Sequence, residues 1–368
     1  MKSPRSSLFI NLIIAGILLV VCAACDSTTP IDEPPPGEDP LVECPQQSLS
    51  TWEFVGLQAD NIDRIKALAV HPSKPNVLYA GSSFNFSAGL EGKLFKSIDC
   101  GASWDTLRTG GSYLDIQFDP HDPATIYAVP YGILKSTDHG HTWTDISEGI
   151  GLDPERRVTS LVIDPAHPEV LYAGTSGFHG GSLYKSTDGG ASWTVLDPEN
   201  RRLSNGVISL AIDPSDTEVL YASTNFFGDL YKSTDGGQTW SILLQETNES
   251  IDLLVDPEAS SVIYAAFGDR GVMKSVDTGS SWHAFNEGLP VEKKIRQIIK
   301  NPQTDALLLV NASPNGQGIY IREAGSPLWM RIGIDEHDHG YYYSDLMLAD
   351  EGQRLYFGSD GLYRMRLE

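Results

Sequence analysis

Short hydrophobic runs recur along the chain from about residue 50 to its last residues. In each run Val, Ile, Leu and Tyr alternate with polar residues or cluster over four to six positions. Asp-Pro or Gly-rich turns separate the runs, as is typical of short β-strands rather than helices. The pattern predicts repeated units of four strands each.

A Ser-x-Asp-x-Gly-x-x-Trp box recurs once in most units. Its intact copies end at Trp104, Trp143, Trp193, Trp240 and Trp282. A sixth copy has decayed at residues 322–329, and Trp52 stands without a box. Successive Trp residues from Trp52 to Trp329 are 39 to 52 positions apart, which is the period of propeller blades.

The number of units follows from a second set of markers. Turns ahead of the boxes lie at His71-Pro72, Asp119-Pro120, Asp164-Pro165, Asp213-Pro214, Asp256-Pro257, Asn301-Pro302 and, most degenerate, Ala349-Asp350. Seven turns and seven Trp predict an all-β fold, a single seven-bladed propeller of four-stranded blades.

The two ends of the chain predict how the ring closes. The last unit has three strands, near 345–348, 355–358 and 362–365, and lacks a fourth. Residues 51–54 are a fourth strand with no first three before it. Because pairing these remnants removes both exposed sheet edges, we expect an N-terminal strand in the last blade.

One segment favours a helix by composition. Residues 291–300 would pass for a short amphipathic helix. The repeat register instead aligns residues 295–299 with 158–162, the innermost strand of another unit. We therefore predict a strand there.

The box itself predicts a hairpin turn. Gly supplies positive φ, Asp and Ser side chains accept hydrogen bonds from backbone N–H groups, and Trp opens the next strand and packs between neighbours. The boxes resemble those of the Asp-box (bacterial neuraminidase repeat) propeller superfamily, which includes sialidases, xyloglucanases, sortilin ectodomains and the photosystem II assembly propeller. The resemblance covers about residues 50–368 and implies structural rather than catalytic roles for Asp99, Asp138, Asp188, Asp235 and Asp277.

Residues 1–25 have the layout of a secretory signal. Lys2 and Arg5 precede an apolar run, and small residues stand directly before Cys25. This resembles a bacterial lipobox with Cys25 as the lipidated residue, although Cys22 takes a position usually held by an aliphatic residue. A plain signal peptide or an uncleaved anchor is the alternative. The resemblance implies a lipoprotein of the bacterial cell envelope, facing the extracytoplasmic side.

Composition sets the remaining domains and the sign of the charge. Residues 26–49 are rich in Ser, Thr, Pro and acids and predict a solvated tether, so one propeller at residues 50–368 uses nearly all of the 368 residues. Loss of Lys2 and Arg5 with the signal would change the formal net charge from −23 to −25. So acidic a protein repels nucleic acid and anionic lipid as a whole. We expect membrane contact through the lipid alone, and a monomer.

Two further cysteines remain in a chain that we expect to be exported. Cys44 lies shortly before Trp52, and Cys100 lies inside the first box. If Trp52 belongs to the last blade, both sulfurs can lie on the same side of adjacent blades. We predict a disulfide between them, and two unpaired thiols are the alternative.

In an up-and-down blade, the Asp-Pro turns and the boxes share one face, and the variable loops share the other. Basic residues assigned to the variable loops are Arg64, Arg108, Arg156, Arg157, Arg201, Arg202, Lys293, Lys294 and Arg296. Aromatic residues there include Phe84, Phe86, Tyr131, Phe178, Phe226, Phe227 and Phe267. They predict a rim that binds a protein or glycan partner without catalysis. Alternatively, these cations pair with Glu155, Glu199 and Glu292.

A glycoside hydrolase of the sialidase or xyloglucanase-like type is the rival function, since such enzymes use paired carboxyl groups. Acids on the variable face are Asp60, Asp63, Asp153, Asp269, Asp335 and Asp338. The chain has Arg64-Ile65-Lys66 where sialidases carry Arg-Ile-Pro, and its Tyr341–Tyr343 cluster has no recognisable Glu partner. We nominate no catalytic residue and no cofactor. We also nominate no metal, because the His-containing loop at 335–339 has no matching second cluster.

Overall fold

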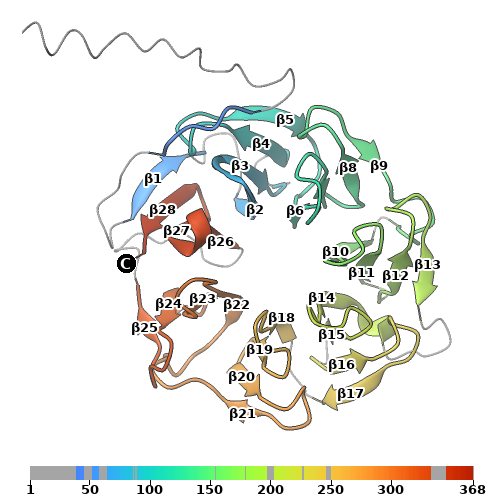
Figure 1. Cartoon of the computed structure of the whole chain (residues 1–368), viewed down its shortest axis with the longest axis vertical. Coiled ribbons are helices and arrows are strands. Elements are labelled where there is room, and N and C mark those ends of the chain that lie inside the picture. Colours follow the sequence, from blue (N-terminus) through green and yellow to red (C-terminus); the bar gives the residue numbers. More distant parts are fainter. Residues whose placement is uncertain are drawn as a thin grey trace, which may run out of the picture. The chain divides into compact units, whose positions relative to one another are not determined.

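The computed structural model describes residues 39–44, 52–57, 64–85, 87, 89–153, 155–178, 180–196, 203–225, 228–245, 250–332 and 345–367. Residues from Leu41 to the C-terminus belong to one compact unit. Within it, seven antiparallel sheets of four strands are arranged in a ring (Figure 1). The predicted all-β, seven-bladed propeller is confirmed.

The first four blades follow the chain in order. Blade 1 contains β2 (Ile65–His71), β3 (Lys74–Ser82), β4 (Lys93–Ser97) and β5 (Asp105–Thr109). Blade 2 contains β6 (Ile116–Phe118), β7 (Ile126–Ala128), β8 (Leu134–Ser136) and β9 (Thr144–Asp145). Blade 3 contains β10 (Arg156–Ile163), β11 (Leu171–Gly177), β12 (Leu183–Ser186) and β13 (Thr194–Leu196). Blade 4 contains β14 (Val207–Ile212), β15 (Leu220–Thr224), β16 (Leu230–Ser233) and β17 (Ser241–Leu244), preceded by η2 (Leu203–Asn205).

The remaining blades continue the ring. Blade 5 contains β18 (Ser250–Val255), β19 (Ile263–Phe267), β20 (Gly271–Ser275) and β21 (His283–Ala284). Blade 6 contains β22 (Ile295–Lys300), β23 (Leu307–Asn311), β24 (Gly318–Arg322) and β25 (Met330–Arg331). Blade 7 contains β26 (Asp345–Ala349), β27 (Arg354–Gly358), β28 (Leu362–Arg366) and β1 (Glu53–Gly56), with η4 (Asp350–Gly352) after β26. The strand β22 lies where we predicted a strand rather than a helix, so that prediction is confirmed.

The ring closes through the first strand of the chain. β1 pairs antiparallel with β28, so that Glu53 lies opposite Arg364 and Phe54 lies opposite Tyr363. Figure 1 shows this blue strand beside the red strands of blade 7. The predicted closure by an N-terminal strand is therefore confirmed, and the edge of β28 that would otherwise be exposed is paired.

The core consists of hydrophobic clusters between adjacent blades. Among the described residues each of seven clusters combines side chains of two neighbouring sheets. Each Trp packs between its own blade and the preceding one; Trp329, for example, is 2% exposed between blades 5 and 6. Burial of such a ring contributes a few kcal/mol at most. The repeated Trp therefore holds neighbouring blades together.

Candidate functional site

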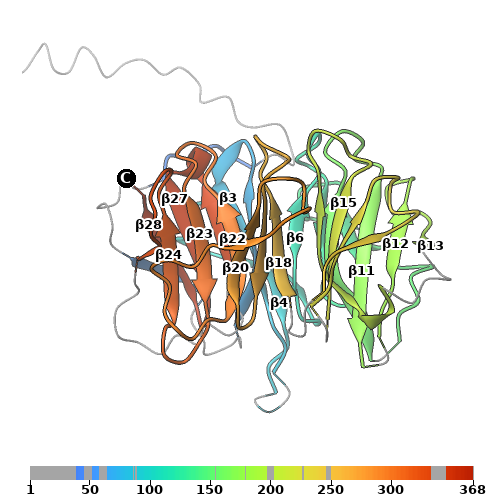
Figure 2. The same ribbon diagram turned by 90° about the horizontal axis from the view of Figure 1, so that it is seen from below.

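The two faces of the propeller carry different connections. Because the strands of a blade alternate in direction, the turns after first and third strands share one face, which we call the box face. The connections after second and fourth strands share the other, which we call the variable face. The β3–β4 connection projects from the variable face at the bottom of Figure 2.

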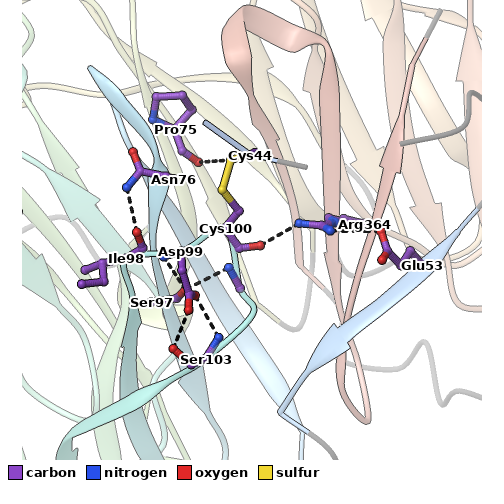
Figure 3. The surroundings of a disulfide bond; sticks show 11 residues. Cys44, Glu53, Pro75, Asn76, Ser97, Ile98, Asp99, Cys100, Ser103 and Arg364 are labelled. Atoms are coloured by element: carbon purple, nitrogen blue, oxygen red, sulfur yellow. Dashed lines mark hydrogen bonds and ion pairs between the residues drawn. A yellow bond between two sulfur atoms is a disulfide. The ribbon is translucent and has the colours of Figure 1, made fainter. Parts of the chain in front are cut away.

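On the box face, each Asp-box carboxylate is held by its own turn. Asp188 Oδ1 accepts hydrogen bonds from Ser186 Oγ at 2.7 Å and from the Ser192 N–H at 2.9 Å, and Asp188 Oδ2 accepts one from Ser192 Oγ at 2.6 Å. Hydrogen bonds from the Ser192 and Ser186 hydroxyls lower the pKa of Asp188 to about 2. Figure 3 shows the same arrangement at Asp99. These carboxylates are ionised, and their oxygens already accept hydrogen bonds within the turn. This arrangement suits a structural role rather than acid–base chemistry.

A disulfide joins the first box to the segment ahead of β1. Cys44 and Cys100 are bonded with an S–S distance of 2.07 Å, and Cys100 is fully buried (Figure 3). Arg364 of β28 donates to the Cys100 carbonyl oxygen from Nη1 at 2.8 Å. The N-terminal segment, blade 1 and blade 7 therefore meet at this point.

On the variable face, two basic and two aromatic residues come together where blades 2 and 3 meet. We call Tyr131, Arg156, Arg157 and Phe178 the blade 3 cluster. The Tyr131 hydroxyl donates to the backbone carbonyl of Asp153, and the Phe178 N–H donates to the carbonyl of Glu155 at 3.3 Å. Phe178 is 83% exposed and Tyr131 is 38% exposed.

The backbone of β10 and β11 positions this cluster. Arg156 lies opposite Gly177 and Arg157 lies opposite Ser176 in the sheet. A Cβ atom at Gly177 would collide with the Glu155 carbonyl oxygen, so glycine allows this close approach. Arg156 donates to the Gly151 carbonyl at 3.1 Å and lies 3.9 Å from the Asp153 carboxylate, whereas Arg157 is exposed. Asp153 neutralises Arg156 only loosely at that distance.

The other predicted rim residues are spread around the ring. Arg108 lies within the outer strand β5, and Arg156 and Arg157 lie within β10, not in loops as the sequence suggested. The reason is that strands extend further toward the variable face than the hydrophobic runs indicate. Arg296 lies within the innermost strand β22, as the repeat register predicted. Lys293 Nζ donates to the Val291 carbonyl at 3.0 Å, and the Lys294 N–H donates to Asn311 Oδ1 at 2.7 Å.

Those predicted basic rim residues that the structure describes thus lie on blades 1, 3 and 6 rather than in one strip. Arg64 lies directly before β2. Several predicted residues lie outside the described part of the chain: Cys25, Arg201, Arg202, Phe86, Phe226 and Phe227. The same is true of the candidate acids Asp60, Asp63, Asp335 and Asp338.

Three carboxyl groups that the sequence did not single out lie on, or directly before, the innermost strands around the axis of the ring. Asp115, Asp252 and Asp345 are followed by the buried residues Ile116, Leu253 and Leu346 at equivalent positions of blades 2, 5 and 7. Burial raises the pKa of Asp115 and of Asp252 to about 6. Burial, together with repulsion by the other two carboxylates, raises the pKa of Asp345 to about 7.

These axial carboxyl groups connect adjacent blades. Asp252 Oδ2 accepts from the Ile298 N–H of the next blade at 2.9 Å, and Asp345 Oδ2 accepts from the Leu68 N–H at 2.7 Å. In blade 6 Gln297 takes the equivalent place, because its Oε1 accepts from the Leu346 N–H at 2.6 Å. The residue type varies at this position, so no repeated motif marked it, although the repeat register could have located it.

The described residues offer no metal centre or membrane-spanning helix. No group of three or more His, Cys, Asp or Glu among them could hold a metal ion. Within that same part of the chain no helix is long and apolar enough to cross a bilayer.

Comparisons with known proteins agree with the propeller fold. A sequence profile of the family described as Photosynthesis system II assembly factor YCF48 matches residues 101–363. A solved structure described as YCF48 bound to D1 peptide has a TM-score of 0.60 at 14% identity, covering 89% of this chain and 98% of that one. YCF48 from Cyanidioschyzon merolae has a TM-score of 0.58 at 15% identity, covering 86% of this chain and 98% of that one.

A curated relative belongs to a group of enzymes. A probable oligoxyloglucan-reducing end-specific xyloglucanase of Neosartorya fischeri is 27% identical over 174 residues. The match covers 41% of this chain and 20% of that protein, so the chain spans about a fifth of the length of that relative.

Proposed function

We propose a protein-binding function for this chain, which belongs to the Photosynthesis system II assembly factor YCF48 family of Asp-box propellers. It binds a segment of a protein partner through its variable face and catalyses no reaction. A related propeller is described as bound to a D1 peptide, which supports a peptide-like ligand. Propellers commonly bind ligands with the loops of one face, while their repeated turns keep the blades in register.

The blade 3 cluster is the observation that carries this proposal. Phe178 is 83% exposed and directly follows Gly177, the sheet partner of Arg156, and Arg157 is exposed as well. Exposed aromatic rings next to forked cations are the residue types that dominate binding energy at protein interfaces. Arg157 would pair with a carboxylate of the partner, and Phe178 would pack against an apolar side chain next to it. The preferred ligand is therefore an acidic segment that contains a large hydrophobic residue.

Binding to synthetic peptides tests the proposal directly. An array of acidic peptides with and without aromatic residues would be probed with wild-type protein, and the best peptide would be titrated by fluorescence anisotropy. We expect Phe178→Ser and Arg157→Glu each to weaken binding about tenfold or more. Val276→Ser is the matched control, because Val276 is 53% exposed in a box turn on the opposite face. Equal affinity of all four proteins would contradict the proposal.

Glycoside hydrolysis is a second candidate. Sequence similarity to xyloglucanases and the raised pKa values of the axial carboxyl groups favour it, since a general acid needs such a pKa. Both oxygens of Asp345, however, already accept hydrogen bonds, from the Leu68 N–H and from Gln297 Nε2. If the wild type released reducing sugar from xyloglucan and Asp345→Asn did not, glycoside hydrolysis would be supported. We expect no release by the wild type.

We also propose that Cys25 carries a lipid that anchors a monomeric protein to the extracytoplasmic side of a bacterial envelope membrane. The support is the apolar run and the small residues directly before Cys25. Cys25→Ala should move the protein out of the membrane fraction of a bacterial host, and mass spectrometry of the wild type should find acyl groups on Cys25. An unmodified Cys25 in membrane-bound protein would overturn this part.

A further inference from the structure

A Lys–Tyr pair joins each blade to the next box turn in blades 1 to 4. Lys96 donates to the His139 carbonyl at 3.0 Å, and Lys135 donates to the Gly189 carbonyl at 3.0 Å. Lys185 and Lys232 donate to the corresponding carbonyls of Gly236 and Thr278, each at 3.4 Å. Every one of these ammonium groups also lies 5.0 to 5.5 Å from a Tyr ring of its own blade. The backbone carbonyl of the next box is thus the regular acceptor for this lysine.

Blade 5 repeats the lysine, but the box that follows it has decayed. Lys274 Nζ lies 5.2 Å from the ring of Tyr264 and 5.0 Å from the ring of Phe285. In blade 6 the box has decayed, with Arg322 in place of its Ser and Ala324 in place of its Asp. Among the described residues Lys274 makes no hydrogen bond or ion pair. Burial and the nearby positive charge of Arg322 lower the pKa of Lys274.

A cavity lies between Lys274 and the decayed box of blade 6. The space between blades 5 and 6 measures about 610 Å³ and is lined by Lys274, Phe285 and Arg322 among others. At the junction of blades 2 and 3, where the box is intact, the space beside Lys135 and Gly189 measures about 310 Å³. We call the larger cavity the blade 5–6 pocket. It lies on the box face, away from the blade 3 cluster.

Arg322 adds a second cation to the pocket. Its guanidinium lies 3.6 Å from the centroid of the Phe285 ring, and its Nε donates to the Ser326 carbonyl at 2.9 Å. Its Nη1 is buried without a hydrogen bond, and the nearest carboxylate, that of Glu287, is 3.6 Å away and largely exposed. Lys274 and Arg322 therefore both have donors available on one cavity.

The third cation of the pocket is already neutralised. Lys300 Nζ lies 2.8 Å from Asp256 and 2.8 Å from Asp305, and it lies 3.8 Å from Glu258. Glu258 and Glu323 also line the pocket. These acids disfavour a dianion such as phosphate more than a singly charged group, because like-charge repulsion grows with ligand charge.

We propose that the blade 5–6 pocket binds a carboxylate, with Lys274 and Arg322 as donors and the Phe285 ring as its apolar wall. A carboxylate oxygen resembles the carbonyl oxygen of an intact box in hybridisation, and its negative charge is attracted to both cations. The carboxylate belongs to a small organic acid or to an acidic group of a peptide. This site is independent of the proposed peptide binding on the variable face.

The test uses a carboxylate and its uncharged analogue on the folded propeller. N-acetylphenylalanine and N-acetylphenylalaninamide would be titrated by calorimetry, and acetylation of Lys274 by acetic anhydride would be mapped by mass spectrometry. We expect only the carboxylate to bind and to protect Lys274. Lys274→Met and Arg322→Met should each weaken binding about tenfold or more, while Lys232→Met, the same change beside an intact box, should not.

Two further probes distinguish the sources of the carboxylate. A tripeptide with a free C-terminus and an amidated tripeptide with a central Glu would be compared with N-acetylphenylalanine. Thermal unfolding would verify that each variant remains folded. Equal binding of acid and amide, or unchanged binding in both pocket variants, would overturn the proposal whatever the result at Phe178.

Discussion

The guanidinium of Arg364 donates a hydrogen bond to the backbone carbonyl oxygen of Cys100 across 2.8 Å. Its Nε and Nη2 atoms also lie 3.1 Å from Glu53 Oε2. Arg364 is 5% exposed and lies in β28, Glu53 lies in β1, and Cys100 lies in the first box. One side chain thus joins three segments that the sequence separates widely.

Replacement of Arg364 should destabilise the ring at its closure. In Arg364→Met the Cys100 carbonyl loses its charged donor and Glu53 loses the guanidinium of Arg364, so we expect the free energy of unfolding to fall by about 3 kcal/mol. Urea unfolding followed by Trp fluorescence measures this. Glu53→Gln keeps an acceptor for Arg364 and should lose about 1 kcal/mol, since Glu53 is half exposed. A larger loss in the Gln variant would contradict this account.

Removal of the disulfide should have a comparable effect. Cys44 and Cys100 are 56 positions apart, and a loop of that length contributes about 4 kcal/mol in the chain-entropy estimate. We expect Cys44→Ser to lower the free energy of unfolding by up to that amount, and added reductant to do the same to the wild type. Reductant should leave the variant unchanged. An unchanged unfolding midpoint in the reduced wild type would show that the bond adds no stability.

The pH dependence of stability should show a maximum near pH 4 to 5. The pKa of Asp188 in the folded protein is about 2, below its unfolded value, so its contribution is lost as the pH falls from about 4 toward 2. The pKa values of Asp115 and Asp345 are about 6 and about 7, above their unfolded values. Stability therefore also falls as the pH rises from about 4 to 7. Thermal unfolding from pH 2 to pH 8 measures both limbs, and a maximum at pH 8 would contradict the second.

A fourth axial carboxyl group should sharpen that dependence. Gln297 Nε2 donates to Asp345 Oδ1 at 2.6 Å, so Gln297→Glu places two carboxyl groups in contact. We expect a loss on the order of 3 kcal/mol at pH 8 and a smaller loss at pH 5, where one group keeps a proton. Gln297→Met, which lacks the added charge, should lose similar stability at both pH values. Equal losses for Glu and Met at pH 8 would show that charge repulsion is unimportant there.

The periodic features of the sequence were sufficient to predict the fold. The spacing of Trp104 to Trp282 and the Asp-Pro turns fixed the number of blades, and the missing fourth strand after residue 365 indicated the pairing with β1. These predictions succeed because each repeated residue has one local role, such as the box Asp in its turn. Such local roles can be predicted from the sequence because the interacting residues are close together along the chain.

The functional features were harder to predict because they break the repeat. Asp115, Asp252 and Gln297 share one position but not one chemistry, and each binds a backbone group of a different blade. The cavity beside Lys274 lies next to the decayed box of blade 6, so the residues around Lys274 in the sequence do not indicate it. The position of Phe178 relative to Arg157 depends on strand register at the start of β10, which hydrophobic runs define poorly.

The pairing of β1 with β28 imposes an order on folding. Blades 1 to 6 can each form as soon as their own four strands have left the ribosome or crossed a membrane. The seventh cannot, because its outer strand is made first and the three others last. The early segment must wait through the synthesis of nearly the whole domain, so ring closure has the longest loop to search and is expected to be the slow, final step of folding.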